Sequence, residues 1–213
     1  MNMSELIQNK LPLVAILRGI QTEEALRYAQ KLIELNYYFI EVPLNSPNAL
    51  VTIKLLQEKI GHLCCIGAGT VTNLDELKAV LATGVKLIVT PNVNTEVIAF
   101  AKSQDCIIFS GVMTPTEAYS AIHAGTTFLK LYPAEIIGIK GLKALKAVLP
   151  KDIECFPVGG ISADFEQMEN YVANGASGFG IGNALYKSGM SFAEFEQNAL
   201  RFKSVCERIS WQK

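Results

Sequence analysis

One lysine stands inside an apolar run that is typical of a buried strand. The run is FLKLY at residues 128–132, and a charged side chain is costly in a parallel strand covered on both faces. Lys130 could be a core lysine that pairs with an acid or extends its ammonium to the rim. We favour a nucleophile instead, because desolvation lowers a lysine pKa from about 10.4 toward neutrality and frees the lone pair to form a Schiff base with a ketone.

A glutamate occupies the equivalent place in an earlier apolar run, FIEVP at residues 39–43. Glu41 could form a structural, buried ion pair with Lys130, provided that the fold brings the two strands together. Alternatively, Glu41 is a general acid and base that moves protons for chemistry at the lysine. Both interpretations place the two side chains in one cavity, so each residue strengthens the case for the other.

An arginine ends another apolar run, AILRG at residues 15–19. The guanidinium of Arg18 could grip a carboxylate or a phosphate through two parallel hydrogen bonds, or it could form a salt bridge at the rim. The segment GAGT at residues 67–70 lacks the third glycine of a dinucleotide-binding fingerprint. We therefore reject a Rossmann nucleotide site.

The elements that must position these residues alternate regularly along the chain. Short apolar runs alternate with segments of helical period, three of which stop at Gly84, Gly125 and Gly175, and this pattern predicts a parallel sheet with crossover helices. Ser46-Pro47, Thr114-Pro115 and Thr22 are candidate helix starts. The predicted strands are Leu13–Leu17, Phe39–Pro43, Cys64–Gly67, Leu87–Thr90, Ile107–Ser110, Phe128–Tyr132, Glu154–Val158 and Gly178–Ile181.

Eight such units without a Pro/Ser-rich linker predict an α/β fold, a closed (β/α)₈ TIM barrel that forms one domain over residues 1–213. The active site of this fold lies at the carboxyl ends of the strands, and a phosphate commonly binds at the loops after strands seven and eight. Those loops are rich in glycine, with Gly160 in one and Gly182 before Asn183 in the other. Although tight turns alone could require these glycines, close approach of backbone N–H groups to phosphate favours an anion site.

Composition excludes several classes of function. The 19 Lys and Arg residues against 20 Asp and Glu, with no basic run, argue against a nucleic-acid partner. The apolar stretch near the N-terminus, residues 11–17, is too short to span a membrane. No cationic region or small-residue cleavage site frames this stretch, so we expect a cytoplasmic protein. Five cysteines, an odd number, indicate reduced core thiols. Only two histidines and no CxxC pair argue against a metal site, and we expect no cofactor.

The chain resembles the KDPG/KHG class I aldolase family, which cleaves 2-keto-3-deoxy-6-phospho sugar acids. The matching segments are LPLVAILRGI, IEVPLNSP, IGAGTV, LIVTPN, LKLYPA, LKALKAVLP with FPVGGIS, and GIGNALY, spread over residues 11–186. The resemblance implies a metal-free homotrimer in which a lysine forms the Schiff base. By their places in the motifs, it assigns Lys130 as nucleophile, Glu41 as proton shuttle, Arg18 and Thr70 to the substrate carboxylate, and Gly160, Gly182 and Asn183 to the phosphate.

The resemblance also bears on the substrate. Gluconate-type members have a threonine and an arginine where this chain has Val158 and Asn45, and this difference implies cleavage of the galactonate-derived acid, 2-dehydro-3-deoxy-6-phospho-D-galactonate, to pyruvate and D-glyceraldehyde 3-phosphate. Two departures are Asn183, where a serine is expected, and a longer segment from Ile161 to Gly175. The alternatives are a gluconate-series or 4-hydroxy-2-oxoglutarate aldolase and a non-catalytic phosphosugar-binding barrel.

Overall fold

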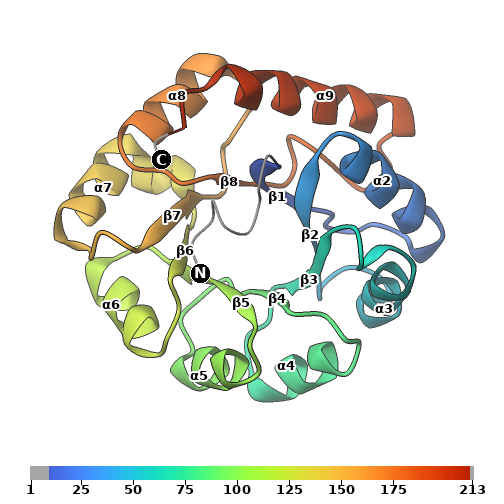
Figure 1. Ribbon diagram of the computed structural model, residues 1–213, viewed down its shortest axis with the longest axis horizontal. Helices are drawn as coiled ribbons and strands as arrows, with labels where there is room; N and C mark the ends of the chain where they lie inside the picture. The colour runs from blue at the N-terminus through green and yellow to red at the C-terminus, as the bar shows by residue number, and fades with distance from the viewer. Residues whose placement is uncertain (1–9, 212–213) are drawn as a thin grey trace.

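The computed structural model describes residues 10–211, and within them a ring of parallel strands is surrounded by helices (Figure 1). The strands form one sheet in the order β7-β6-β5-β4-β3-β2-β1-β8. Isolated bridges, Val158 to Gly180 and Cys155 to Ala176, complete the ring between β7 and β8. The predicted (β/α)₈ barrel is confirmed. The strands are β1 (Leu11–Ile16), β2 (Tyr37–Pro43), β3 (Cys65–Gly69), β4 (Leu87–Val89), β5 (Ile107–Val112), β6 (Phe128–Leu131), β7 (Glu154–Pro157) and β8 (Phe179–Ile181).

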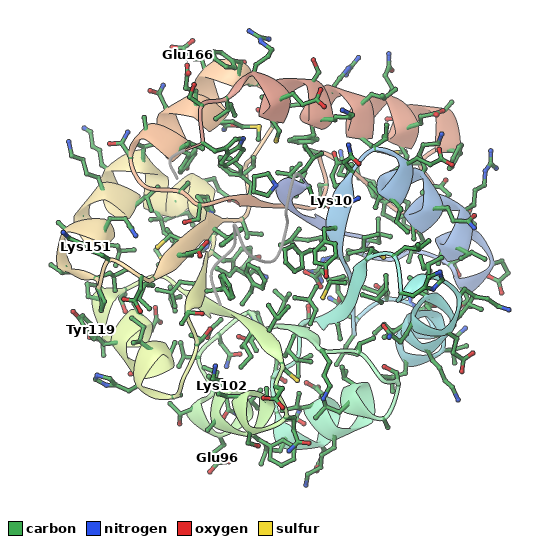
Figure 2. All side chains as sticks on the ribbon, in the orientation of Figure 1. Lys10, Glu96, Lys102, Tyr119, Lys151 and Glu166 are labelled. Carbon is green, nitrogen blue, oxygen red and sulfur yellow. The ribbon has the colours of Figure 1, made fainter. Side chains whose placement is uncertain are left out.

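The helices cover the outside of the ring, and Figure 2 shows Glu96 and Glu166 pointing outward from two of them. Gly84, Gly125 and Gly175 have positive φ angles of 88°, 111° and 103°, as expected where a helix gives way to the next strand. None of the helices in residues 10–211 is both long and apolar enough to cross a membrane. The helices are α2 (Thr22–Glu34), α3 (Ala49–Ile60), α4 (Leu74–Leu81), α5 (Thr95–Ser103), α6 (Pro115–His123), α7 (Ala134–Val148), α8 (Phe165–Ala173) and α9 (Phe192–Arg208).

The predicted helix starts have different outcomes. Thr114 caps α6 in a complete capping box with Glu117, as its Thr-Pro signal indicates. Thr22 is the first residue of α2. The Ser46-Pro47 signal is wrong as a helix start, because α3 begins at Ala49. The buried Ser46 hydroxyl instead accepts a hydrogen bond from the Gly19 N–H at 2.9 Å, which joins the loops after β1 and β2.

Side chains fill the barrel in layers, because alternate residues of each strand point inward. The lower layer is aromatic, and the ring of Phe109 lies 5.0 Å from that of Phe128 and 4.8 Å from that of Phe156, between centroids. Phe39 of β2 and Phe128 of β6 belong to this aromatic layer. Two residues further along the same strands, the next inward positions are Glu41 and Lys130. The sequence period therefore places both ionisable groups directly above a closed, apolar floor.

Candidate active site

Lys130 lies in β6, which pairs with β5 at Gly111 and with β7 at Phe156. Its side chain is 5% exposed. Burial lowers the pKa of Lys130, the Glu41 carboxylate opposes that shift, and the Arg18 guanidinium adds to it. A lysine in this setting holds a neutral, nucleophilic amine over a wider pH range than an exposed lysine does.

Glu41 lies in β2 opposite Ile16 of β1 and Gly67 of β3, and it is 1% exposed. Its carboxylate lies against the backbone of Gly69, where any side chain would overlap its oxygens. One carboxylate oxygen, Oε2, has no hydrogen-bond partner. Burial raises the pKa of Glu41 from 4.5 to about 7, although Lys130 and Arg18 both act to lower it. The group is therefore poised to gain and lose a proton near neutral pH.

The two ionisable groups share a cavity but do not form an ion pair. Glu41 and Lys130 line a small cavity of about 10 Å³ together with Val158 and the Phe109 ring, a volume close to what one water molecule needs. Among the ion pairs of the described residues, none joins Lys130 to Glu41. The arrangement thus separates a buried amine and a buried acid, as a proton relay requires, rather than neutralising one with the other.

Above this cavity, a cleft of about 480 Å³ opens at the carboxyl ends of the strands. Lys130 lines both spaces, so its side chain lies where the cleft meets the small cavity. Five of the seven residues predicted from the sequence line the cleft, and they are Arg18, Lys130, Gly160, Gly182 and Asn183. The sixth, Glu41, lies in the cavity beneath.

The glycines at the cleft differ in their backbone conformation and in the space around them. Gly159 and Gly160 both have positive φ angles, 98° and 66°, which side-chain-bearing residues rarely adopt. The Gly160 carbonyl accepts a hydrogen bond from Gln167 Nε2 at 2.9 Å, which connects this turn to α8. A Cβ on Gly182 would have no neighbour within 4 Å. Gly182 therefore leaves its backbone open to an incoming anion.

Arg18 lies two residues beyond β1, which ends at Ile16, so the expectation that it ends the strand is wrong. The backbone of Leu17 still hydrogen-bonds to Glu41 O across the sheet, but the chain then turns toward Ile20. The exposed guanidinium donates a 2.6 Å hydrogen bond from Nη1 to Asn45 Oδ1. Asn45 thereby fixes the cation at the mouth of the cleft.

Thr70 is the seventh predicted residue, and it lines neither the cleft nor the cavity. It follows Gly69, against which the Glu41 carboxylate rests. Its φ angle is 59°, an unfavourable conformation for a β-branched residue, and such conformations concentrate at functional sites. The structure thus brings Thr70 to the Glu41 side of the barrel mouth.

Sequence reasoning missed several residues that line the cleft, among them Tyr132, Glu135, Ser162 and Lys187. The Tyr132 ring lies 5.0 Å from Lys130 Nζ, within range of a cation–π contact. Glu135, in the first turn of α7, covers the Gly159-Gly160 turn. Tyr132 is the last residue of its predicted strand and could have been found there. Glu135, Ser162 and Lys187 lie three, four and six residues beyond the predicted strand ends at Tyr132, Val158 and Ile181, so a search limited to the strand ends cannot find them.

Comparison with known proteins identifies the family of this chain. The family model described as KDPG and KHG aldolase matches residues 4–197. A 2-dehydro-3-deoxy-6-phosphogalactonate aldolase from Escherichia coli K12 is 40% identical over 92% of this chain and 94% of its own.

Solved structures give the same relationship. A native KDPGal structure is 39% identical and superposes with a TM-score of 0.91 over 97% of this chain and 98% of its own. A subunit of a cube-shaped protein cage, designed by fusing symmetric oligomeric domains, is 39% identical, with a TM-score of 0.90 over 93% of this chain and 73% of its own. The chain belongs to the KDPG and KHG aldolase family, which uses class I, Schiff-base chemistry.

Proposed function

We propose that this protein cleaves 2-dehydro-3-deoxy-6-phospho-D-galactonate to pyruvate and D-glyceraldehyde 3-phosphate. The observation that carries the proposal is the buried Lys130 amine at the base of the cleft, next to a buried glutamate with which it forms no ion pair. The similarity to the 2-dehydro-3-deoxy-6-phosphogalactonate aldolase from Escherichia coli supports the substrate.

Lys130 attacks the C2 ketone of the substrate, and the resulting carbinolamine loses water to give an iminium. When the C3–C4 bond breaks, its electron pair moves into the iminium and forms an enamine, while the C4 hydroxyl loses a proton and becomes the aldehyde of glyceraldehyde 3-phosphate. Protonation of the enamine at C3 regenerates the iminium. Water then hydrolyses it, which releases pyruvate and the free lysine.

Glu41 moves the protons in this scheme. It accepts the C4 hydroxyl proton during cleavage and returns a proton to C3, through one water molecule in the small cavity that it shares with Lys130. A pKa of about 7 suits both directions of transfer, because the carboxyl group gains and loses a proton at similar cost near neutral pH.

The two ends of the substrate are anionic, and the site offers different groups to each. The Arg18 guanidinium, fixed by Asn45, binds the substrate carboxylate together with Thr70. The phosphate lies against the backbone of Gly160 and Gly182, with the Asn183 amide as a further donor.

Val158 and Asn45 support the galactonate epimer. Val158 lines both the cleft and the cavity, next to Lys130. A threonine there would offer a hydroxyl to the substrate C4 hydroxyl, whereas the valine offers only methyl groups. A gluconate-series substrate is the alternative, and kcat/KM for both epimers distinguishes the two assignments.

Borohydride reduction in the presence of pyruvate tests the mechanism. We expect one covalent pyruvate-derived adduct, located by peptide mass spectrometry at Lys130, and none in Lys130→Ala. Lys151→Ala is the matched control, because Lys151 is exposed in the loop before β7 (Figure 2) and lies at the opposite end of the barrel. An adduct on another lysine would overturn the assignment. The absence of any adduct would favour the non-catalytic phosphosugar-binding barrel.

We also propose that the protein is a cytoplasmic homotrimer. The designed cage, built from fused symmetric oligomeric domains that include a subunit similar to this chain, supports oligomerisation. All five cysteines are free thiols, which suits a reducing compartment. Light scattering coupled to size-exclusion chromatography should give a mass three times the 23.2 kDa of the chain, and a monomer or dimer would contradict the proposed assembly.

A further inference from the structure

The turn after β8 is rigidly anchored and carries a lysine into the cleft. The Gly182 carbonyl accepts hydrogen bonds from the N–H groups of Leu185 and Tyr186 at 2.8 and 3.0 Å. Both side chains are buried beneath the turn. Lys187 follows directly, and its own carbonyl accepts from the Met190 N–H at 3.0 Å. The backbone of Lys187 is therefore fixed, while its exposed side chain lines the cleft beside Gly182 and Asn183.

The ionisable residues that line the cleft are few, and most are already engaged. The acidic and basic ones are Arg18, Lys130, Glu135 and Lys187. Arg18 is hydrogen-bonded to Asn45 in the loop after β2. Lys130 must be neutral to act as a nucleophile. Glu135 adds negative charge beside the Gly159-Gly160 turn, which makes a dianionic phosphate harder to hold there.

Lys187 is the remaining cation among the residues that line the cleft. In the described part of the chain, its ammonium makes no ion pair, whereas Lys31, Lys54 and Lys203 each pair with a glutamate. Nor does a hydrogen bond hold its Nζ among the described residues, in contrast to Lys86 and Lys146, which donate to backbone carbonyls. The charge of Lys187 is thus free to meet a ligand.

We propose that Lys187 is a specificity-determining residue whose ammonium neutralises the substrate phosphate. The inference rests on the proposed function and extends it. The glycine backbone offers neutral N–H groups that fit any small anion, so a full positive charge at this end of the cleft would add a preference for a phosphate dianion. Lys187 supplies this charge, and it acts on the phosphorylated end alone, far along the substrate from the bond that breaks.

The test compares Lys187→Met with Lys151→Met, which removes the same charge at the opposite end of the barrel. The measured quantity is the ratio of kcat/KM for the phosphorylated sugar acid to kcat/KM for its unphosphorylated analogue. We expect this ratio to fall about tenfold in Lys187→Met, mainly through KM, because an ammonium–phosphate hydrogen bond contributes about this factor. Lys187→Arg should restore most of the ratio, and Lys151→Met should leave it unchanged.

A second measurement does not depend on turnover. Inorganic phosphate should raise the melting temperature of wild type and Lys151→Met by the same amount, and of Lys187→Met by less. An unchanged kcat/KM ratio and an unchanged phosphate-induced shift in Lys187→Met would overturn the inference. The pyruvate adduct at Lys130 separates this failure from failure of the proposed function, because trapping with pyruvate involves no phosphate.

Discussion

Replacing Glu41 by glutamine should make the free energy of unfolding less sensitive to rising pH. Glu41 is buried, its Oε2 has no hydrogen-bond partner, and its pKa is raised from 4.5 to about 7. The folded state therefore binds this proton more tightly than the unfolded state does. The stability that the protonated group allows is fully present below pH 4.5 and is lost as the pH rises to 7.

The magnitude follows from the two pKa values. Each pKa unit corresponds to about 1.4 kcal/mol, so ionised Glu41 lowers the free energy of unfolding by about 3 kcal/mol at pH 8. At pH 5 the corresponding loss is about 1 kcal/mol, because this pH lies only slightly above the pKa of 4.5 that the carboxyl group has in the unfolded chain. Between pH 5 and pH 8, wild type should therefore lose about 2.5 kcal/mol relative to Glu41→Gln.

Urea unfolding of both proteins at pH 5, 6, 7 and 8, at one protein concentration, measures this difference. The cost of burying a glutamine amide is the same at every pH and cancels in the comparison. The other titrating groups are common to the two proteins, and the one coupled to Glu41 is Lys130, whose pKa the carboxylate raises. Parallel stability curves would refute the reasoning. They would mean that the Glu41 carboxylate is compensated in the folded protein, as in the ion-pair interpretation.

Three further outcomes are expected. The kcat/KM for cleavage by wild type should fall tenfold per pH unit below about pH 7, because Glu41 is then protonated. Glu41→Gln should lose about 10²- to 10⁴-fold in rate at pH 8 while still forming the pyruvate adduct. A flat pH profile of wild type would leave Glu41 without a proton-transfer role. Gly182→Phe should fold normally and raise KM for the phosphorylated substrate, because its side chain would enter open space at the cleft; an unchanged KM would place the phosphate elsewhere. Val158→Thr should shift the kcat/KM ratio toward the gluconate epimer, and a wild-type preference for that epimer would defeat the galactonate assignment.

The period of the strands made the central pair predictable. Lys130 and Glu41 stand in runs that are otherwise apolar, and each lies two residues after an inward-facing phenylalanine, Phe128 or Phe39. Strand alternation then directs both ionisable groups into the barrel. The glycines of the last two loops were predictable for a related reason, since a barrel places those loops at the same end as the strand termini.

Loops and long side chains were less predictable. The Ser-Pro signal at Ser46 indicates a helix start, but the hydroxyl instead bonds a neighbouring loop that is distant in the sequence. Tyr132, Glu135 and Lys187 lie beyond the observed strand ends and still line the cleft. Whether a side chain in such a loop points into the cleft depends on how the loop packs against the rest of the fold. Buried Leu185 and Tyr186 fix the turn that presents Lys187, and no local pattern encodes that geometry.

The ring of strands is weakest between β7 and β8, which are joined only by isolated bridges at Val158–Gly180 and Cys155–Ala176. The proposed phosphate loops follow these two strands, whereas Lys130 and Glu41 lie in strands that form ladders with a neighbour on each side. Backbone amides of β7 and β8 along this bridged seam should exchange with solvent faster than those of β2 and β6. A bound phosphate should slow the exchange, because it would bridge the two loops. The residues that break the bond therefore lie in strands paired on both sides, whereas the proposed phosphate loops follow the two strands that share only bridges, so changes in the substrate tail could be accommodated there without altering Lys130 or Glu41.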